Sequence, residues 1–158
     1  MRLWPTGVAI VTSTDSLGNA EGMTVNSLIS ISLEPPLVLV SLAKPSRTLA
    51  AVEDSGMFAV SILSSGSNEL CWSFARDSES REFSDFVDLE KIPIANASGA
   101  AFACRVEQKF DVADHMLIVG RVEVTARMDN STKPLVFYNG ALREIGEGES
   151  PIELFEDW

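Results

Sequence analysis

The most informative segment of this chain is Gly22-Met23-Thr24-Val25-Asn26-Ser27-Leu28-Ile29-Ser30-Ile31-Ser32-Leu33-Glu34-Pro35-Pro36. Its β-branched residues predict one strand over residues 24 to 32, which ends before the two prolines because proline has no amide donor for a sheet ladder. Alternation along that strand places Thr24 and Asn26 on the face opposite Val25. Polar groups on such a strand suit a ligand-binding strand, and the alternative is an edge strand whose hydroxyls contact only water.

The β pattern continues on both sides of this stretch. Residues 7 to 14 are rich in β-branched side chains and run into turn-forming residues 15 to 19, which predicts a hairpin. Further strands are predicted at residues 36 to 43, 57 to 63, 102 to 110, 122 to 126, 135 to 138 and 142 to 145. Many strands with few helices indicate a mainly β protein, built as a closed or partly open antiparallel barrel.

Two short helices interrupt the strands. Ser46 is placed to cap a helix that runs through Asp54 and stops at Gly56. Ser67 is placed to cap a second helix that reaches Arg76. The highly charged residues from 76 to 90 are then predicted to form a solvated loop or lid.

Composition limits the kinds of partner this chain can have. Its 158 residues, 46% of them hydrophobic, suit a single domain over residues 1–158. Twelve basic residues against 23 acidic ones give a net charge of −11, which repels a nucleic-acid backbone. We therefore expect no nucleic-acid partner. An anionic ligand can bind only where local amides, hydroxyls and an arginine outweigh this field.

Other features indicate a protein of the cytoplasm. No apolar run reaches the roughly 20 residues that span a bilayer, and the start of the chain lacks the apolar segment of a signal peptide. The only cysteines, Cys71 and Cys104, fit a reducing compartment, with a disulfide between them as the alternative. One histidine and no Cys-x-x-Cys motif argue against a zinc site, so no metal is expected.

A second candidate site follows the strand at residues 36 to 43. The segment Lys44-Pro45-Ser46-Arg47-Thr48 lies at the predicted start of a helix. Helix amides, two hydroxyls and a guanidinium converge there, and these are the groups that bind a phosphate monoester. A capped helix without a ligand is the alternative.

These segments, in this order, resemble a known family. Trp4-Pro5-Thr6-Gly7-Val8, the stretch from Gly22 to Pro36, Pro36-Leu37-Val38-Leu39-Val40-Ser41-Leu42 and the Lys44 to Thr48 segment are similar to the N-terminal half of the flavin reductase family, the FMN-binding split-barrel proteins. The resemblance runs from Leu3 to Ile145. It implies a Greek-key split β-barrel with two or three short helices, and a homodimer with a flavin site near the subunit interface.

The resemblance also implies roles for individual residues. It assigns the isoalloxazine ring and ribityl chain to Thr24, Val25, Asn26 and Ser27, the path of the chain to Ser41, and the phosphate to Ser46, Arg47 and Thr48. Hydroxyl and amide side chains can match the N5, O4, N3 and O2 edge of the ring.

Two residues further along complete the predicted site. His115, in Asp114-His115-Met116-Leu117-Ile118-Val119-Gly120, resembles the family histidine beside the flavin where nicotinamide docks, although Ala113 replaces the family's glycine. A structural histidine is the alternative. The segment Arg81-Glu82-Phe83 resembles one that covers the flavin, with Phe83 packing on the ring. A charged surface loop with one anchoring aromatic is the alternative there.

The function that follows is reduction of FMN, or of FAD, by NADH or NADPH. No Gly-x-Gly-x-x-Gly motif is present, so the nicotinamide would bind without a Rossmann unit. Reduced flavin would pass to a monooxygenase or another acceptor. The alternatives are an FMN-binding electron carrier or sensor of the same fold, and an interaction module that has lost its ligand. Residues 146–158 are expected to be a flexible or dimer-docking tail.

Overall fold

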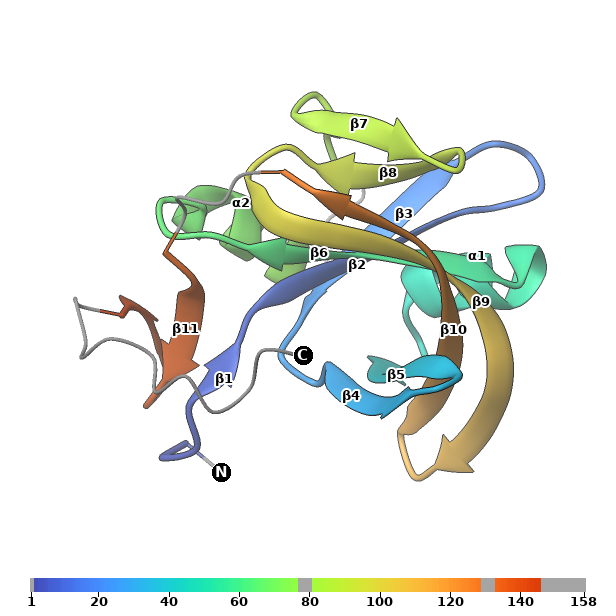
Figure 1. Cartoon of the computed structure of the whole chain (residues 1–158), viewed down its shortest axis with the longest axis horizontal. Coiled ribbons are helices and arrows are strands. Elements are labelled where there is room, and N and C mark those ends of the chain that lie inside the picture. The colour runs from blue at the N-terminus through green and yellow to red at the C-terminus, as the bar shows by residue number, and fades with distance from the viewer. Residues whose placement is uncertain (1, 77–80, 129–132, 146–158) are drawn as a thin grey trace.

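A seven-stranded antiparallel sheet forms the frame of the computed structural model, which describes residues 2–76, 81–128 and 133–145 (Figure 1). The strand order in this sheet is β3-β2-β6-β9-β10-β5-β4. The strands are β2 (Ala9–Thr14), β3 (Ala20–Val25), β4 (Ile29–Leu33), β5 (Pro36–Ala43), β6 (Met57–Leu63), β9 (Ser98–Val112) and β10 (His115–Arg127).

Two smaller sheets flank this frame. One has the order β1-β11-β12 and contains β1 (Thr6–Gly7), β11 (Leu135–Tyr138) and β12 (Ala141–Glu144). The other is a hairpin of β7 (Phe86–Leu89) and β8 (Ile92–Ala95). The hairpin is tied to the frame by a buried hydrogen bond of 3.0 Å from the Ala95 amide to the Ser61 hydroxyl.

The long strands β9 and β10 bend the frame around its core, as Figure 1 shows. Their ladder is shifted between Val119 and Gly120 and again between Val122 and Val124. Such bulges increase local twist and bend a strand. The outer strands of the sheet, β3 and β4, do not pair with each other, so backbone hydrogen bonds do not close a barrel among the described residues. The fold is mainly β with two helices, as predicted.

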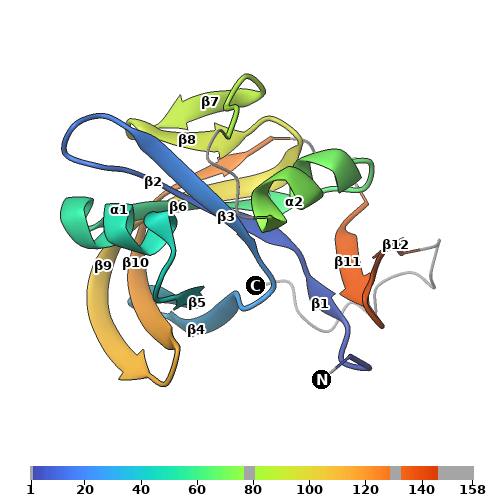
Figure 2. The same ribbon diagram turned by 180° about the vertical axis from the view of Figure 1, so that it is seen from behind.

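Both helices lie on the same side of the molecule and flank β3 (Figure 2). Helix α1 (Arg47–Ser55) begins where the Ser46 hydroxyl accepts from the Leu49 amide, and ends at Gly56, whose φ is 69°. That left-handed conformation suits glycine, which has no Cβ. Helix α2 (Asn68–Ala75) follows Ser67 and ends at Arg76. The predicted cap is wrong in one respect, because the Ser67 hydroxyl makes no capping bond and donates instead to the Ala97 carbonyl at 3.1 Å.

The core is apolar and divides into separate clusters. Its largest cluster joins strands β2, β3, β5, β6, β9 and β10 with α1, through Val11, Val25, Val40, Phe58, Cys104, Ile118, Leu49 and Val52. A second cluster lies under α2 and includes Val8, Ile10, Leu63, Phe74 and Leu135. Both cysteines are free and buried, Cys71 in α2 and Cys104 in β9.

Several predicted elements are confirmed. These include the strands at 36 to 43, 57 to 63 and 135 to 138, the helix capped by Ser46, and the helix that follows Ser67. The tail at residues 146–158 lies outside the described residues, as do residues 77–80 of the predicted loop.

Two predictions about elements are wrong. The single strand at residues 24 to 32 is two strands, because β3 ends at Val25 and β4 begins at Ile29. The predicted loop after Arg76 contains β7, which is the first strand of the β7–β8 hairpin. The many charged residues predict a loop, but Phe86 packs against the core, with its ring centroid 5.3 Å from that of Phe74.

Candidate functional site

The interruption between β3 and β4 borders a cavity of about 960 Å³. Residues 26 to 29 line one side of it, and the N-terminal segment from Arg2 to Ala9 lines the other. Its walls also include Ile62 and Phe137. This volume is near the upper end of the range of about 300–1,000 Å³ typical of small-molecule sites.

Few polar groups face this mainly apolar cavity. They include Asn26, Ser27 and Thr6, and apolar lining comes from side chains such as Trp4 and Leu28. The Thr6 hydroxyl is buried and has no hydrogen-bond partner within the described structure. Apolar walls with a few placed polar groups are the usual lining of a cofactor site, and a buried hydroxyl without a partner is available to a ligand.

Ser27 explains why the chain breaks its ladder here. Its hydroxyl donates to the Ser41 carbonyl at 3.1 Å and accepts from the Ser41 amide at 3.0 Å. One side chain therefore satisfies both backbone groups of a residue on β5, where no neighbouring strand does so from this side. The structure thus brings together Ser27 and Ser41, two residues that the family resemblance assigns to one ligand.

Thr24 and Val25 are not among the residues that line this cavity. The Thr24 hydroxyl donates to the Cys71 carbonyl of α2 at 2.7 Å, and Val25 lies in the main core with 7% of its surface exposed. Both side chains hold the end of β3 in place, immediately before Asn26.

His115 and Ser41 share one face of the sheet. In the β5–β10 ladder His115 pairs with Ala43 and Leu117 pairs with Ser41. Directly paired residues point to the same side, and so do residues two apart on one strand. The residues between them, such as Leu42 and Ile118, face the core. We call the opposite side of β4, β5, β9 and β10 the outer face; it also carries Ile29, Leu39, Phe110 and Val112.

His115 begins β10 and has a carboxylate beside it. Its Nδ1 lies 2.8 Å from Asp114 Oδ1, and its side chain is 44% exposed. The hydrogen bond from His115, with smaller contributions from a backbone hydrogen bond and from the charge on His115, lowers the pKa of Asp114. An ionised carboxylate only accepts, so Nδ1 carries the proton and Nε2 is left to contact a ligand. Ala113 adopts a φ of 50° in the turn, the left-handed region where glycine is favoured.

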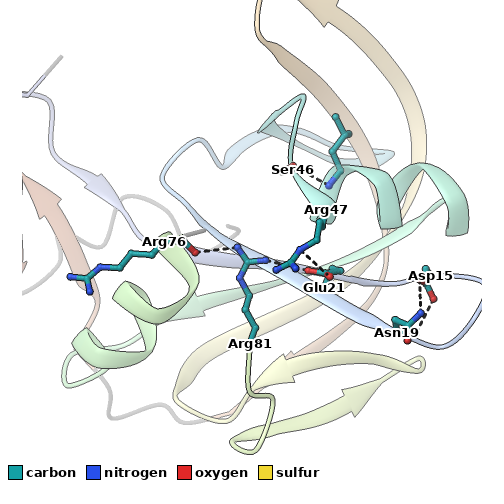
Figure 3. A network of polar contacts seen from close by, with 8 residues as sticks. Asp15, Asn19, Glu21, Ser46, Arg47, Arg76 and Arg81 are labelled. Carbon is teal, nitrogen blue, oxygen red and sulfur yellow. Dashed lines mark hydrogen bonds and ion pairs between the residues drawn. The ribbon is translucent and has the colours of Figure 1, made fainter. Parts of the chain in front are cut away.

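A compact group of charges lies at the start of α1 (Figure 3). Arg47 Nε is 3.3 Å from Glu21 Oε1, and Arg81 Nη1 is 3.2 Å from Glu21 Oε2. Thr48 is fully buried, and its hydroxyl has no hydrogen-bond partner among the described residues. The Ser46 hydroxyl caps the helix and donates to the Ala43 carbonyl at 2.7 Å. We call Glu21, Arg47 and Arg81 the charge triad.

Phe83 lies away from the cavity, in an aromatic cluster under α2. Its ring is 5.3 Å from that of Phe74 and 5.0 Å from that of Phe86. Contact between Phe83 and a flavin stays a prediction.

Comparison with known proteins identifies the family. The model of the flavin reductase like domain matches residues 1–146. The NADH-dependent FMN reductase AsuE2 of Streptomyces nodosus subsp. asukaensis is 36% identical over 149 residues, which cover 89% of this chain and 79% of the relative. This chain belongs to the flavin reductase-like family.

Two solved structures have a similar fold. Nitrilotriacetate monooxygenase component B from Mycobacterium thermoresistibile matches with a TM-score of 0.88 and 31% identity, over 98% of this chain and 88% of that one. The NADH:FAD oxidoreductase SgcE6 of Streptomyces globisporus C-1027, in complex with NAD and FAD fragments, matches with a TM-score of 0.86 and 29% identity, over 94% and 90% of the two chains. A probable flavin reductase of Rhizobium meliloti is longer, and this chain spans 38% of its length.

Two residues of the charge triad are not predicted from the sequence alone. The sequence-based expectations give Glu21 no role, and they include Arg81 only in the segment that ends at Phe83. A signal for Glu21 existed, because it shares strand parity with Met23 and Val25, which pack against the core. An acidic residue at an inward-facing position calls for a cationic partner.

The described residues of this flavin reductase-like chain contain no group of three or more metal-ligating side chains. They also contain no helix long and apolar enough to cross a membrane.

Proposed function

We propose that the protein is a flavin reductase that uses NADH or NADPH to reduce FMN or FAD. The observation that carries this proposal is the cavity beside Asn26 and Ser27, formed in a chain whose family model covers residues 1–146. AsuE2 is an NADH-dependent FMN reductase, and SgcE6 is an NADH:FAD oxidoreductase. Component B of nitrilotriacetate monooxygenase supports a monooxygenase as the acceptor of the reduced flavin.

In this proposal the isoalloxazine ring enters the cavity. Asn26 and Ser27 contact its polar edge. Thr24 and Val25 contribute to the site by fixing the end of β3, next to Asn26. Ser41 lines the path of the ribityl chain, since Ser27 already contacts its backbone. Phe83 packs with Phe74 and Phe86, and its contact with the flavin ring remains a prediction from the family resemblance.

The phosphate lies at the start of α1, where Ser46, Arg47 and Thr48 bind it. Ser41 and Ala43 are two residues apart on β5, about 7 Å at the rise of a strand. Ala43 in turn accepts from Ser46. This spacing suits one ligand that has a ring at one end and a phosphate at the other.

His115 orients the nicotinamide or the flavin edge through Nε2. Bound flavin supplies the chemistry, because it accepts a hydride from a dihydronicotinamide when the two rings are stacked. The protein then has to hold the two rings in register and exclude water, for which no protein nucleophile is needed. His115 and Ser41 both lie on the outer face of the sheet, so one ligand could reach both of them, which supports this role.

We further propose a homodimer that covers the outer face. Ile29, Phe110 and Val112 on this face are 55%, 48% and 47% exposed. β4 is also an edge strand with unpaired backbone groups. Exposed apolar side chains beside an open sheet edge favour association, and a second copy of this chain offers the same surface. Because Ile29 also lines the cavity, this arrangement puts the flavin near the subunit interface.

We also propose that the curved sheet is a Greek-key split barrel, that residues 1–158 form one domain, and that the protein is cytoplasmic. Free, buried thiols at Cys71 and Cys104 are consistent with a reducing compartment.

Anaerobic flavin bleaching tests the function directly. Purified protein is mixed with excess FMN and then with NADH or NADPH, and the visible absorption of the flavin is followed. Catalytic bleaching of the excess FMN is the expected result. Bound FMN that stays yellow with both nicotinamides would indicate the electron carrier or sensor instead, and failure to bind any flavin would indicate an interaction module.

A further inference from the structure

In the charge triad the carboxylate of Glu21 is bound by two arginines, Arg47 and Arg81. Glu21 is on β3, Arg47 is the first residue of α1, and Arg81 lies in the segment between α2 and β7, so three separate parts of the chain meet at one carboxylate (Figure 3). Each oxygen of Glu21 contacts one guanidinium, at 3.3 Å for Arg47 and 3.2 Å for Arg81. Other arginines pair more closely, since Arg121 reaches Glu107 with two bonds of 2.7 and 2.6 Å. The contacts of Glu21 are therefore long and divided between two partners.

The two arginines differ in burial. The Arg81 side chain is 9% exposed, its Nη2 donates to the Arg76 carbonyl at 3.3 Å, and its Nε has no hydrogen-bond partner in the described structure. The Arg47 side chain is 41% exposed. A buried cation is costly without its carboxylate partner. An ion pair made by an exposed cation contributes little to stability and is easily exchanged for another partner. Arg81 thus keeps Glu21 in place, and Arg47 is the more accessible of the two partners of the carboxylate.

Arg47 lies at a position that suits an anion. As the first residue of α1 it lies beside the amides of the first helical turn, which bind anions. A phosphate at this helix start and the carboxylate of Glu21 would then need the same guanidinium. Charge-assisted bonds from arginine to phosphate are strong, but part of their strength is offset if a resident carboxylate must first be displaced.

We propose that Glu21 is an internal competitor of the flavin phosphate for Arg47, and that it weakens phosphate binding so that flavin exchanges as a substrate. This inference rests on the proposed function, because it assumes a phosphate at the start of α1. In the ligand-free protein Arg47 pairs with Glu21. When the phosphate binds, Arg47 turns to it while Glu21 stays with Arg81.

The test compares FMN with riboflavin, which has the same ring and ribityl chain but no phosphate. Dissociation constants for both are measured by flavin fluorescence in the wild-type protein, in Glu21→Gln and in Glu53→Gln. Glu53 is an exposed residue of the same helix, paired with Lys109 at 2.8 Å, so its change removes one negative charge away from Arg47. The ratio of the riboflavin constant to the FMN constant isolates the phosphate contribution.

Glu21→Gln should raise this ratio about threefold to fivefold, the effect of removing one exposed ion pair, and slow FMN release by a similar factor. Glu53→Gln should leave the ratio unchanged. In an Arg47→Ala background the effect of Glu21→Gln should disappear, because there is no guanidinium to compete for. If Glu21→Gln does not fold, Glu21→Asp keeps the charge beside Arg81, shortens the reach to Arg47 and should raise the ratio as well.

The outcomes separate the two levels of the argument. A wild-type protein that prefers FMN but shows no rise, or a fall, in the ratio on Glu21→Gln overturns the competition and leaves the reductase intact. A rise that persists in the Arg47→Ala background also overturns it, because Glu21 would then act on the phosphate directly. A wild-type protein that binds FMN no better than riboflavin overturns both the competition and the proposed phosphate site.

Discussion

At Gly120 a single methyl group decides whether the core can pack. A Cβ at this position would lie 2.9 Å from Cys104 Cβ and would overlap the ring of Phe58, which is fully buried. Rigid, buried neighbours cannot move aside as a flexible surface side chain can. Gly120 therefore lets β10 cross directly over the core beside the bulge that bends it.

Gly120→Ala should accordingly destabilise the protein by about 2–3 kcal/mol, the cost of overpacking a filled core. Denaturant unfolding measures this as a lower midpoint. Gly7→Ala is the control, because a Cβ there meets nothing within 4 Å. Equal midpoints for Gly120→Ala and the wild type would show that the strand shifts to make room.

Cys104 links stability to alkaline pH. Burial, and to a lesser extent the charge of Glu123, raises the pKa of its thiol from 9.0 to about 12. Between these values the unfolded chain loses this proton while the folded protein keeps it, so unfolding releases a proton. Stability from this group is present in full below pH 9 and declines as the pH rises towards 12, by at most about 1.4 kcal/mol per pH unit.

Cys104→Ala should therefore have a smaller decline in unfolding free energy from pH 9 upwards than the wild type. The measurement is denaturant unfolding at several pH values, and the difference between the two proteins cancels the titration of other groups. Parallel curves would mean that the thiol also ionises in the folded state.

His115 tests the proposed reaction at the level of one side chain. If it orients a ring and transfers no proton, His115→Ala should slow flavin reduction by less than about a hundredfold. His115→Gln, whose amide reaches towards the Nε2 position, should retain more activity than His115→Asn, whose amide stays near Asp114. Stopped-flow reduction with saturating flavin measures this. Complete loss of hydride transfer with flavin binding intact would contradict an orienting role.

Among the secondary-structure elements, the turn between β7 and β8 has residues that do not suit its backbone conformation. Leu89 pairs with Ile92, and the two residues between them, Glu90 and Lys91, have φ values of 52° and 67°. Two successive positive φ angles favour Asn-Gly in a two-residue hairpin. The hairpin of β11 and β12 has that pair, Asn139 and Gly140.

Replacing Glu90 by Asn together with Lys91 by Gly should stabilise the protein by about 1 kcal/mol, because each non-glycine residue in this region carries a steric cost. The reverse change, Gly140→Lys in the second hairpin, should destabilise it by a similar amount. Thermal unfolding of both variants makes the comparison. A lower melting temperature for the first variant would mean that the glutamate and lysine side chains make contacts that outweigh the strain.

Elements with local signals were predictable. Ser46 and Gly56 mark both ends of α1, and the alternation in β9 and β10 identified these strands. The interruption after Val25 was not predictable, because it depends on the Ser27 side chain meeting a strand 14 residues away. Along the sequence alone, the hydroxyls of this stretch are compatible with an unbroken strand.

At the scale of the whole molecule, the outer face predicts the oligomeric state. Phe110→Glu places a charge in the middle of the proposed dimer surface and should convert a dimer to a monomer, because burying an unpaired charge is costly. Leu17→Glu is the matched control in the turn between β2 and β3, where Leu17 is 85% exposed. Sedimentation velocity measures both. A wild-type monomer, or a Phe110→Glu dimer, would rule out this surface.

The amino-acid sequence alone predicts the mainly β class, the two short helices, the Ser46 cap of α1 and the family resemblance. These follow from periodicity, caps and turn residues that act within a few positions along the chain. Only the tertiary structure decided where β3 stops, which face His115 shares with Ser41, and that a cavity lies between residues 26–29 and the N-terminal segment. It also decided the pairing of Glu21 with Arg81, 60 residues apart. Such contacts depend on strand register and on how helices dock, and no local pattern encodes either of them.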